Sequence, residues 1–204
     1  IWFQQALKAG RGSPERARFH FHEPNADGTP PNNWISLFGG PSWTQVEDGQ
    51  YYLHLFDSSQ PDLNWDNPEV VSDYEVTLRF WLDLGVDGFR IDTAKHVDNQ
   101  FFAKWWPKML EQTNSTMNAK GQKLFAFGEF YDSDIYSQAN YLRKYGLPSV
   151  LDFAFQNRAL SFAAGSGSNN LADLYANDNR FVTKQKSPYD MVTFLGNHDM
   201  GRAA

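Results

Sequence analysis

Residues 86–96 of this chain read VDGFRIDTAKH, a short apolar stretch that ends in charged and titratable side chains. The apolar part predicts a buried strand from Val86 to Ile91. Four side chains that can carry charge then fall within seven residues: Arg90, Asp92, Lys95 and His96. Charged groups at the end of a buried strand are costly unless they act together. The stretch therefore predicts a functional site.

The composition narrows the class of protein. The chain has 204 residues, of which 41% are hydrophobic and 16% aromatic, enough for a substantial core. Its formal net charge is -6 and it has no basic block, which argues against a nucleic-acid partner. No run approaches about 18 consecutive apolar residues, so we expect no membrane partner. The absence of cysteine excludes thiol catalysis and disulfides.

The two ends of the chain predict that the natural protein continues beyond both of them. The chain opens on IWFQQAL, without an initiating Met, and stops at GNHDMGRAA, just after an apolar run. Both ends look cut through a fold, so a targeting signal would not be visible in this sequence. The sequence also leaves the oligomeric state open.

Residues 1–66 predict an irregular, loop-rich domain. The segments PNADGTPPNNW and FGGPSW are rich in turn residues, and YYLHLF is the clearest short strand. The aromatic residues Trp34, Trp43, Tyr52 and Trp65 suit the core of this domain better than a surface that stacks on a ligand.

The pattern changes at residue 67 and predicts a second domain over residues 67–204. Asn67, Pro68 and Glu69 form a helix start, with a capping Asn and Pro at the first helical position. Gly85 is the expected end of this helix. Apolar residues at steps of three and four predict its buried face, namely Val70, Tyr74, Leu78, Trp81 and Leu82.

Strands and helices then alternate along the chain. The segments KLFAFGEF at 123–130, SVLDFAF at 149–155 and DMVTFLGNHD at 190–199 predict further strands. Helices are expected around the aromatic residues of 102–110 and over 169–176. Such alternation predicts an α/β fold built from parallel βαβ units.

Each strong predicted strand finishes with an acid: Asp92, Glu129 and Asp199. Asp152 ends the weaker SVL strand. In a parallel α/β protein these strand ends share one edge, where active sites are built. The spacing therefore predicts three carboxylates on one rim.

Retaining glycoside hydrolysis is a chemistry that needs such carboxylates. One acts as nucleophile and a second, about 5 Å away, protonates the leaving oxygen. Arg90, two residues before Asp92, is expected to keep Asp92 ionised. Glu129 follows the apolar FAFG, a setting that we expect to raise its pKa as a general acid requires.

Two other interpretations of the acids remain. Asp, Glu and His at strand ends also bind divalent metals, although the dense ligand runs typical of zinc sites are absent. Alternatively, each acid caps the helix that follows it, and for Asp152 this interpretation is favoured.

The motifs resemble those of a known family. GVDGFRIDTAKH, FAFGEF and FLGNHD resemble three motifs of the α-amylase superfamily, glycoside hydrolase family 13, and QPDLNW at 60–65 resembles a fourth. WFQQALKAGRGSPERARF and PPNNWISLFGG resemble the loop-rich domain of α-glucosidases and oligo-1,6-glucosidases. From DTAKH onward the chain is more similar to α-amylases.

The resemblance implies a partial (β/α)8 TIM barrel with the loop-rich domain inserted after its third strand. The first strands, the last strand and the C-terminal β-domain of the family are missing. By position it implies Asp92 as nucleophile, Glu129 as acid/base and Asp199 as transition-state stabiliser. The implied substrate-binding residues are Arg90, Lys95, His96 and His198.

The resemblance also implies the reaction, which is hydrolysis of α-1,4 or α-1,6 glucosidic bonds in malto- or isomalto-oligosaccharides through a glucosyl-aspartate. An endo-acting α-amylase, a transglycosylase or sugar isomerase, and a non-catalytic carbohydrate binder are the alternatives. Catalysis needs no cofactor, and a structural calcium would use Asp62 and His96. The sequence does not fix the location of the protein. If it is an α-glucosidase we expect it in the cytoplasm, and if it is amylase-like we expect it to be secreted.

Overall fold

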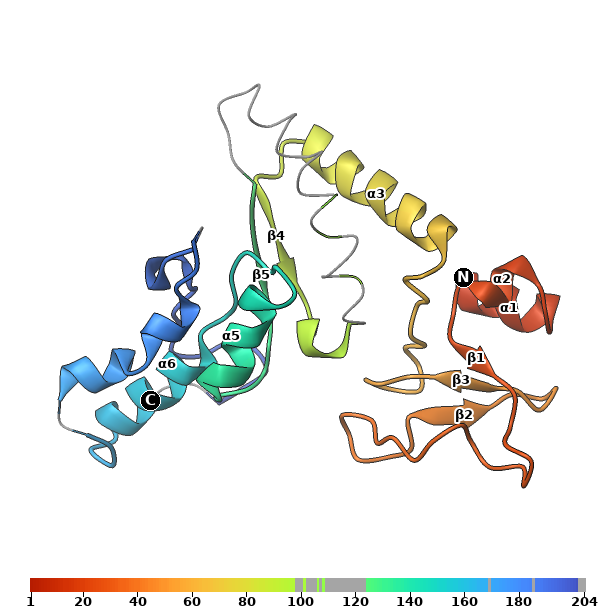
Figure 1. Ribbon diagram of the computed structural model, residues 1–204, viewed down its shortest axis with the longest axis horizontal. Helices are drawn as coiled ribbons and strands as arrows, with labels where there is room; N and C mark the ends of the chain where they lie inside the picture. Colours follow the sequence, from red (N-terminus) through yellow and green to blue (C-terminus); the bar gives the residue numbers. More distant parts are fainter. Residues whose placement is uncertain are drawn as a thin grey trace. The chain divides into compact units, whose positions relative to one another are not determined.

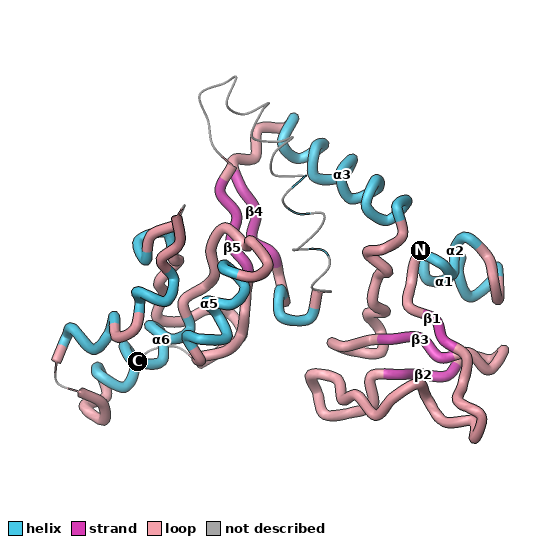
Figure 2. Tube along the Cα trace, viewed as in Figure 1, coloured by secondary structure: helices cyan, strands magenta, loops and turns pink. Residues whose placement is uncertain are grey.

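The computed structural model describes residues 1–97, 101, 106, 108, 124–168, 170–184 and 186–201. The chain divides into two compact units, Ile1–Phe80 and Trp81–Ala204. Figure 1 labels their elements, and Figure 2 distinguishes helix, strand and loop. The domain boundary expected after residue 66 stays a prediction.

The first unit combines a helix pair with a small antiparallel sheet (Figure 1). Its elements are α1 (Trp2–Ala9), α2 (Pro14–Ala17), β1 (Phe21–His22), β2 (Trp43–Gln45), β3 (Tyr51–Leu53) and the first part of α3 (Pro68–Asp83). The strand order is β1-β3-β2, and only the first three residues of the expected strand YYLHLF are in β3. Long turns join these short strands, so the predicted loop-rich character is confirmed.

Buried aromatic residues form the core of the first unit. Trp43, Tyr52 and Trp65 are buried, which confirms that they belong to the core. Trp34, by contrast, is exposed. The sequence pattern could not separate it from Trp43 and Trp65, because all three tryptophans lie among similar turn residues.

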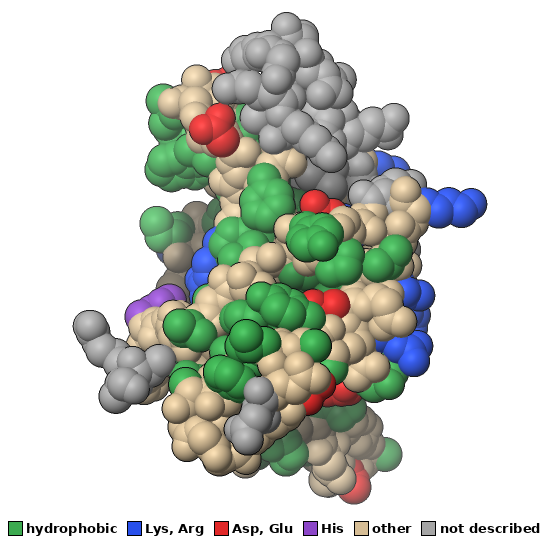
Figure 3. All heavy atoms as spheres, turned by 90° about the vertical axis from the view of Figure 1, so that its left-hand side faces the viewer, with side chains coloured by type: hydrophobic (Ala, Val, Ile, Leu, Met, Phe, Trp, Pro, Cys, Tyr) green, Lys and Arg blue, Asp and Glu red, His purple; other side chains and the backbone are tan. Residues whose placement is uncertain are grey.

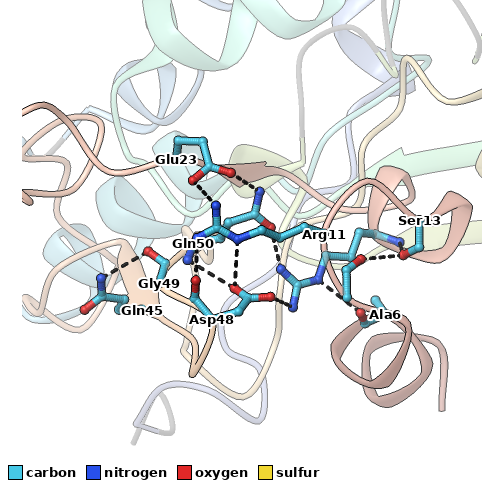
Figure 4. A network of polar contacts seen from close by, with 10 residues as sticks. Ala6, Arg11, Ser13, Glu23, Gln45, Asp48, Gly49 and Gln50 are labelled. Atoms are coloured by element: carbon cyan, nitrogen blue, oxygen red, sulfur yellow. Dashed lines mark hydrogen bonds and ion pairs between the residues drawn. The ribbon is translucent and has the colours of Figure 1, made fainter.

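A polar network fastens the helix pair to the sheet (Figure 4). Arg16 is buried, and its Nη2 lies 2.6 Å from Asp48 Oδ2 while its Nε donates to the carbonyl oxygen of Ala6 at 3.1 Å. Arg11 pairs with Glu23 at 2.7 Å. A carboxylate next to the buried guanidinium compensates for part of its lost hydration.

Helix α3 begins where the sequence predicts. The side chain of Asn67 accepts a hydrogen bond from the backbone N–H of Glu69 at 2.9 Å, and Gly85 follows the helix with a left-handed φ of 94°. Val70 is buried, but Trp81 is 48% exposed, so the predicted burial of Trp81 is wrong. The helix is held to the core in its first half, where Tyr74 packs on Trp65.

The second unit is built on a parallel ladder. Strands β4 (Gly88–Ile91) and β5 (Phe125–Gly128) pair in parallel with Ile91 opposite Gly128. Parallel bridges join Gly128 to Val150 and Leu151 to Val192. The four segments therefore lie side by side in chain order, as the βαβ prediction requires. The expected strands at 149–155 and 190–199 are reduced to these bridges.

Helices follow the strand segments. They are α5 (Ile135–Arg143), α6 (Phe153–Ala163) and the 3-10 turns η1 (Ala94–His96), η3 (Leu171–Tyr175), η4 (Asp178–Phe181) and η5 (Pro188–Asp190). The helix expected over 169–176 is instead the 3-10 turn η3. Asn170 caps it by accepting from the backbone N–H of Ala172 at 3.0 Å. Most of the helix expected around 102–110 lies outside the described residues.

Apolar side chains remain on the surface of the second unit. Figure 3 shows hydrophobic side chains gathered on one face. Exposed apolar residues of this unit include Leu171, Tyr175, Val182 and Tyr189. Within the part of the chain that the structure describes, no helix is both long and apolar enough to cross a membrane.

Candidate active site

The carboxyl ends of β4 and β5 bring two predicted site residues together. Asp92 and Glu129 each follow the last residue of a strand, and those last residues, Ile91 and Gly128, are register partners. The backbone N–H of Glu129 donates to the carbonyl oxygen of Ile91 at 2.8 Å, which continues the ladder by one bond. The predicted rim is therefore present for Asp92 and Glu129.

Arg90 bridges the two acids. Its Nη1 lies 2.5 Å from Asp92 Oδ1, and its Nη2 lies 2.7 Å from Glu129 Oε1. The Asp92 side chain is 66% exposed and that of Glu129 is 7% exposed. One guanidinium thus serves a solvent-accessible carboxylate and a buried one, a geometry for which arginine is suited. The surroundings of Glu129 are less apolar than the FAFG segment indicates.

Thr93 is a site residue that sequence reasoning missed. It takes the left-handed conformation with φ 45° and ψ 37°, which is unusual for a β-branched residue. Its backbone N–H donates to Glu129 Oε2 at 3.2 Å. Both oxygens of Glu129 are therefore held, one by Arg90 and one by Thr93. No residue pattern indicates this turn, because glycine is the usual sequence signal for it.

Close packing beneath the site fixes the strand ends. Ala94 is fully buried. A Cβ added at Gly128 would lie 2.9 Å from the Ala94 Cβ and 2.6 Å from Leu147 Cδ2. Only glycine allows η1 and the chain before Pro148 to approach β5 this closely.

Lys95 and His96 lie on η1, immediately after the Asp92 turn. Lys95 Nζ is 3.4 Å from Asp132 Oδ2 and 5.4 Å from the ring centroid of Phe130. Burial, with the nearby Lys95 charge, lowers the pKa of His96. Asp132 is a second residue that the motifs did not predict, although it lies three residues after Glu129.

His198 and Asp199 form a separate pair in this structure. His198 Nε2 lies 3.1 Å from Asp199 Oδ2, and both side chains are exposed. Their segment rests on α6, where Gln156 Nε2 donates to the carbonyl oxygen of Leu195 at 3.4 Å. Among the described residues, no hydrogen bond or ion pair joins this pair to Arg90, Asp92 or Glu129. The role of Asp199 at the same rim stays a prediction.

Asp152 caps a helix, as the sequence favoured. Its Oδ1 accepts from the backbone N–H of Phe155 at 2.8 Å, in the first turn of α6. Burial raises the pKa of Asp152. Asp178 lies near it, and burial together with the Asp152 charge raises the pKa of Asp178 to about 6. Arg158 Nη1 lies 3.9 Å from Asp178 Oδ1.

The proposed calcium ligands belong to different units. Asp62 is in the first unit, where its Oδ2 accepts from the backbone N–H of Leu55 at 2.8 Å, and His96 is in the second. In the described part of the chain, no group of three or more His, Asp or Glu side chains lies close enough together to hold a metal ion. Calcium prefers six to eight oxygen ligands, so calcium binding by Asp62 and His96 stays a prediction.

The fold and the site define a class of protein. A parallel α/β sheet carries, at the carboxyl ends of adjacent strands, two acids bridged by an arginine. The whole chain, residues 1–204, matches the family described as alpha amylase, catalytic domain. The chain belongs to this α-amylase family.

Similar proteins carry several names within this family. The chain is 41% identical to an α-amylase of Streptomyces lividans over 144 residues, 69% of this chain and 15% of that protein. It is 49% identical to an α-glucosidase of Culex pipiens over 104 residues, 49% of this chain and 17% of that protein. The match covers only a small part of either relative's length.

A solved structure supports the fold. The crystal structure of an α-amylase from H. orenii is similar over 99% of this chain and 40% of that chain, with a TM-score of 0.75 and 28% sequence identity. The parallel ladder of the second unit therefore fits part of a (β/α)8 barrel.

Proposed function

We propose that the protein hydrolyses α-1,4 or α-1,6 glucosidic bonds in malto- or isomalto-oligosaccharides with retention of configuration. The observation that carries the proposal is the Arg90 bridge between Asp92 and Glu129. Retaining glycosidases hold their two carboxyl groups about 5 to 5.5 Å apart. Two acids that share one guanidinium are suited to that separation.

The proposed reaction has two steps. In the first, a carboxylate oxygen of Asp92 attacks the anomeric carbon, the bond to the leaving oxygen breaks, and Glu129 donates a proton to that oxygen. In the second, Glu129 takes a proton from water, the water oxygen attacks the anomeric carbon, and the bond to Asp92 breaks. Exposure of Asp92 suits the attacking group, because the substrate must reach it.

We propose that Arg90 interacts mainly with Asp92 during the first step and less with Glu129. In this structure it contacts both acids. For Glu129 to hold the proton that it donates, the guanidinium must act mainly on Asp92, whose negative charge it stabilises before attack. Substrate in the site excludes water and strengthens that pairing.

The other predicted residues take binding roles in this proposal. Asp199 stabilises the positive charge of the transition state, and His198 contacts the sugar. Lys95 and His96 line the leaving-group side, with Lys95 held by Asp132. A structural calcium at Asp62 and His96 remains part of the proposal.

The architecture in the longer natural protein is also a proposal. Residues 1–66 are taken as the domain inserted after the third strand of the barrel, and residues 67–204 as the central part of that barrel. The loop-rich first domain favours an α-glucosidase over an endo-acting α-amylase. The name α-glucosidase of the Culex pipiens relative supports this choice.

The test measures release of nitrophenol from p-nitrophenyl α-glucoside by the full natural protein, beside its Asp92→Asn variant. Loss of nearly all activity in the variant is expected, because the amide cannot form the covalent intermediate. Asp87→Asn is the matched control, since Asp87 is exposed and precedes β4. Proton NMR of the first product is expected to show the α-anomer.

A second variant separates the acid from the nucleophile. Glu129→Gln is expected to lose more activity on maltose than on p-nitrophenyl α-glucoside, because nitrophenolate leaves without a proton. Equal loss on both substrates contradicts the acid role. Cleavage of soluble starch with no action on the glucoside indicates an α-amylase, and inertness on both indicates a carbohydrate-binding protein.

A further inference from the structure

Gln138 of α5 is a fully buried polar residue that the catalytic proposal does not use. Its Nε2 donates to two backbone carbonyl oxygens, that of Asp132 at 2.8 Å and that of Leu151 at 3.2 Å. Asp132 lies in the chain that leaves β5, and Leu151 lies in the next parallel segment of the ladder. Gln138 therefore ties together two neighbouring segments at the carboxyl ends of the strands.

The partners of Gln138 determine how its amide is oriented. Carbonyl oxygens only accept hydrogen bonds, so the amide nitrogen must face them and the amide oxygen takes the other position. In the described part of the chain, this Oε1 is buried and has no hydrogen-bond partner. A buried amide oxygen without a partner is costly, and Leu or Met would avoid that cost. What glutamine adds at this position is the pair of donors.

Asp132 passes this constraint on to Lys95. Its Oδ1 accepts from the backbone N–H of Asp134 at 2.9 Å, and its Oδ2 lies 3.4 Å from Lys95 Nζ. Its backbone N–H donates to the carbonyl oxygen of Phe130 at 2.8 Å. With its carbonyl held by Gln138, every polar group of Asp132 is engaged. The carboxylate that pairs with Lys95 is therefore fixed in position.

Tyr141 extends the same face of α5 towards the backbone of Lys95. It lies three residues after Gln138, and so on the same side of the helix. Its hydroxyl lies 3.5 Å from the carbonyl oxygen of Lys95. Its ring centroid lies 4.1 Å from that of Phe130, and Lys95 Nζ lies 5.4 Å from the Phe130 centroid. One helix face thus contacts both segments that carry the Lys95–Asp132 pair.

The ion pair alone would hold Lys95 only weakly. The Lys95 side chain is 42% exposed and that of Asp132 is 27% exposed, so water screens their attraction. A lysine side chain also loses much rotamer freedom when its ammonium group is held in one place. The position of Lys95 therefore depends on a carboxylate that is itself immobile, and Gln138 supplies that immobility from the buried side.

We propose that Gln138 is a positioning residue that acts through Asp132 to hold Lys95 on the leaving-group side of the site. The inference rests on the proposed function, in which Lys95 lines that side. A fixed ammonium group donates to the hydroxyls of a sugar leaving group, whereas a nitrophenyl group offers no hydroxyl. Gln138 is therefore expected to favour substrates with a sugar leaving group over aryl glucosides.

The test compares kcat/KM for maltotriose and for p-nitrophenyl α-glucoside in the full natural protein and its Gln138→Met variant. Methionine keeps the length and the apolar body of the side chain and removes both donors. The ratio of the two kcat/KM values is expected to fall about tenfold, the loss of one charge-assisted hydrogen bond. Most of the change is expected in KM for maltotriose, because that bond is present before the reaction as well as during it.

Gln156→Met is the matched control. Gln156 is also a buried glutamine on a helix, and its Nε2 donates to the carbonyl oxygen of Leu195 at 3.4 Å. This variant is expected to leave the ratio of the two kcat/KM values unchanged, because it does not contact Asp132 or Lys95. The proposal is overturned if both glutamine variants change the ratio equally, or if Gln138→Met keeps the ratio of the parent.

Tyr141→Phe is a second variant that removes only one hydroxyl and keeps the buried ring. It is expected to lower the same ratio by about twofold to threefold, because the hydrogen bond that it removes is long. A Tyr141→Phe variant with the ratio of the parent would show that this face of α5 does not position Lys95.

The position of Lys95 is also measured without any substrate. Reductive methylation with carbon-13 formaldehyde gives each lysine an NMR resonance, and Lys95→Arg assigns that of Lys95. Asp132→Asn and Gln138→Met are expected to shift the Lys95 resonance in the same direction, and the double variant to shift it no further than Asp132→Asn alone. A Lys95 resonance that ignores Gln138→Met overturns the proposal.

Hydrolysis and positioning can fail separately. A protein that hydrolyses neither substrate but whose Lys95 resonance responds to Gln138→Met contradicts the proposed function and supports the positioning of Lys95. A hydrolase whose Lys95 resonance and substrate ratio both ignore Gln138→Met contradicts the positioning role and leaves the proposed function intact.

Discussion

At the scale of single residues, the site depends on the planar guanidinium of Arg90. Its two terminal nitrogens reach a carboxylate on β4's end and a carboxylate on β5's end. A lysine carries the same charge on a single nitrogen and cannot reproduce the fork. The contact to both carboxylates therefore requires an arginine at position 90, and a positive charge alone is not enough.

Replacing Arg90 with lysine tests that conclusion. Arg90→Lys is expected to lower kcat/KM for p-nitrophenyl α-glucoside by about a hundredfold, because one of the two acids loses its partner and its orientation. The pH dependence of kcat/KM is expected to shift as well. Arg79→Lys, at an exposed position on α3, is the control. A loss of activity with an unchanged pH profile would argue for a merely structural role.

At Thr93, by contrast, the contact to Glu129 comes from the backbone N–H and not from the side chain. Its left-handed φ of 45° costs about 1 to 2 kcal/mol for a residue with a Cβ. Thr93→Gly is expected to leave the free energy of unfolding unchanged or raise it by up to about 1 kcal/mol, because the gain exceeds glycine's entropy cost. Urea unfolding measures it.

The control for Thr93 is the same substitution in a helix. Thr77→Gly, inside α3, is expected to lower the free energy of unfolding by about 0.3 to 0.5 kcal/mol, the difference in helix propensity between the two residues. If both glycine variants destabilise the protein equally, the left-handed turn at Thr93 stores no strain. The hydrogen bond to Glu129 comes from the backbone, so activity of Thr93→Gly is expected to stay near that of the parent.

At the scale of elements, the close contact between β5 and η1 limits what the strand end tolerates. Gly128→Ala would place a methyl group 2.6 Å from Leu147 Cδ2 and 2.9 Å from the Ala94 Cβ. We expect it to lower the free energy of unfolding by about 1 to 3 kcal/mol, the usual cost of overpacking. Thermal unfolding measures the change.

Gly40→Ala is the control for this substitution. At Gly40 the nearest atom to an added Cβ is Ser36 Oγ at 3.8 Å, which is ordinary contact, and the expected change is within about 0.5 kcal/mol. A Gly128→Ala variant as stable as Gly40→Ala would show that Leu147 moves away without cost.

Local sequence signals predicted some elements better than others. Both ends of α3 could be predicted from Asn67 and Gly85, because helix capping depends on residues that are close in the sequence. The exposure of Trp81 could not be predicted in this way, since burial depends on which element covers a helix. The turn η3 was predicted as an α-helix because its residues favour either geometry.

At the scale of the whole molecule, the pairing of Asp92 with Glu129 followed from apolar runs that end in acids, because parallel strands place their carboxyl ends at one edge. The Thr93 turn and the Asp132 partner of Lys95 depend on contacts between distant segments. No local pattern contains them.

The contribution of Asp178 to the stability of the molecule is expected to fall as pH rises from about 4 to about 6. Burial and the neighbouring Asp152 raise the pKa of Asp178 from 3.8 to about 6, with Arg158 opposing them. At Asp178 the folded state therefore binds more protons than the unfolded state across this window. Its contribution to the free energy of unfolding decreases with pH until the carboxyl is ionised in both states. Asp152 shifts in the same direction.

The Asp178→Asn variant tests this expectation because its side chain stays neutral at every pH. It is expected to match the parent near pH 4 and to exceed it by about 1 to 2 kcal/mol near pH 7, a figure reduced for solvent screening of a side chain that is 16% exposed. Urea unfolding across the pH range measures the difference, with Asp173→Asn on exposed η3 as control. A difference that does not change with pH would show that Asp178 ionises in the folded protein as readily as in the unfolded chain.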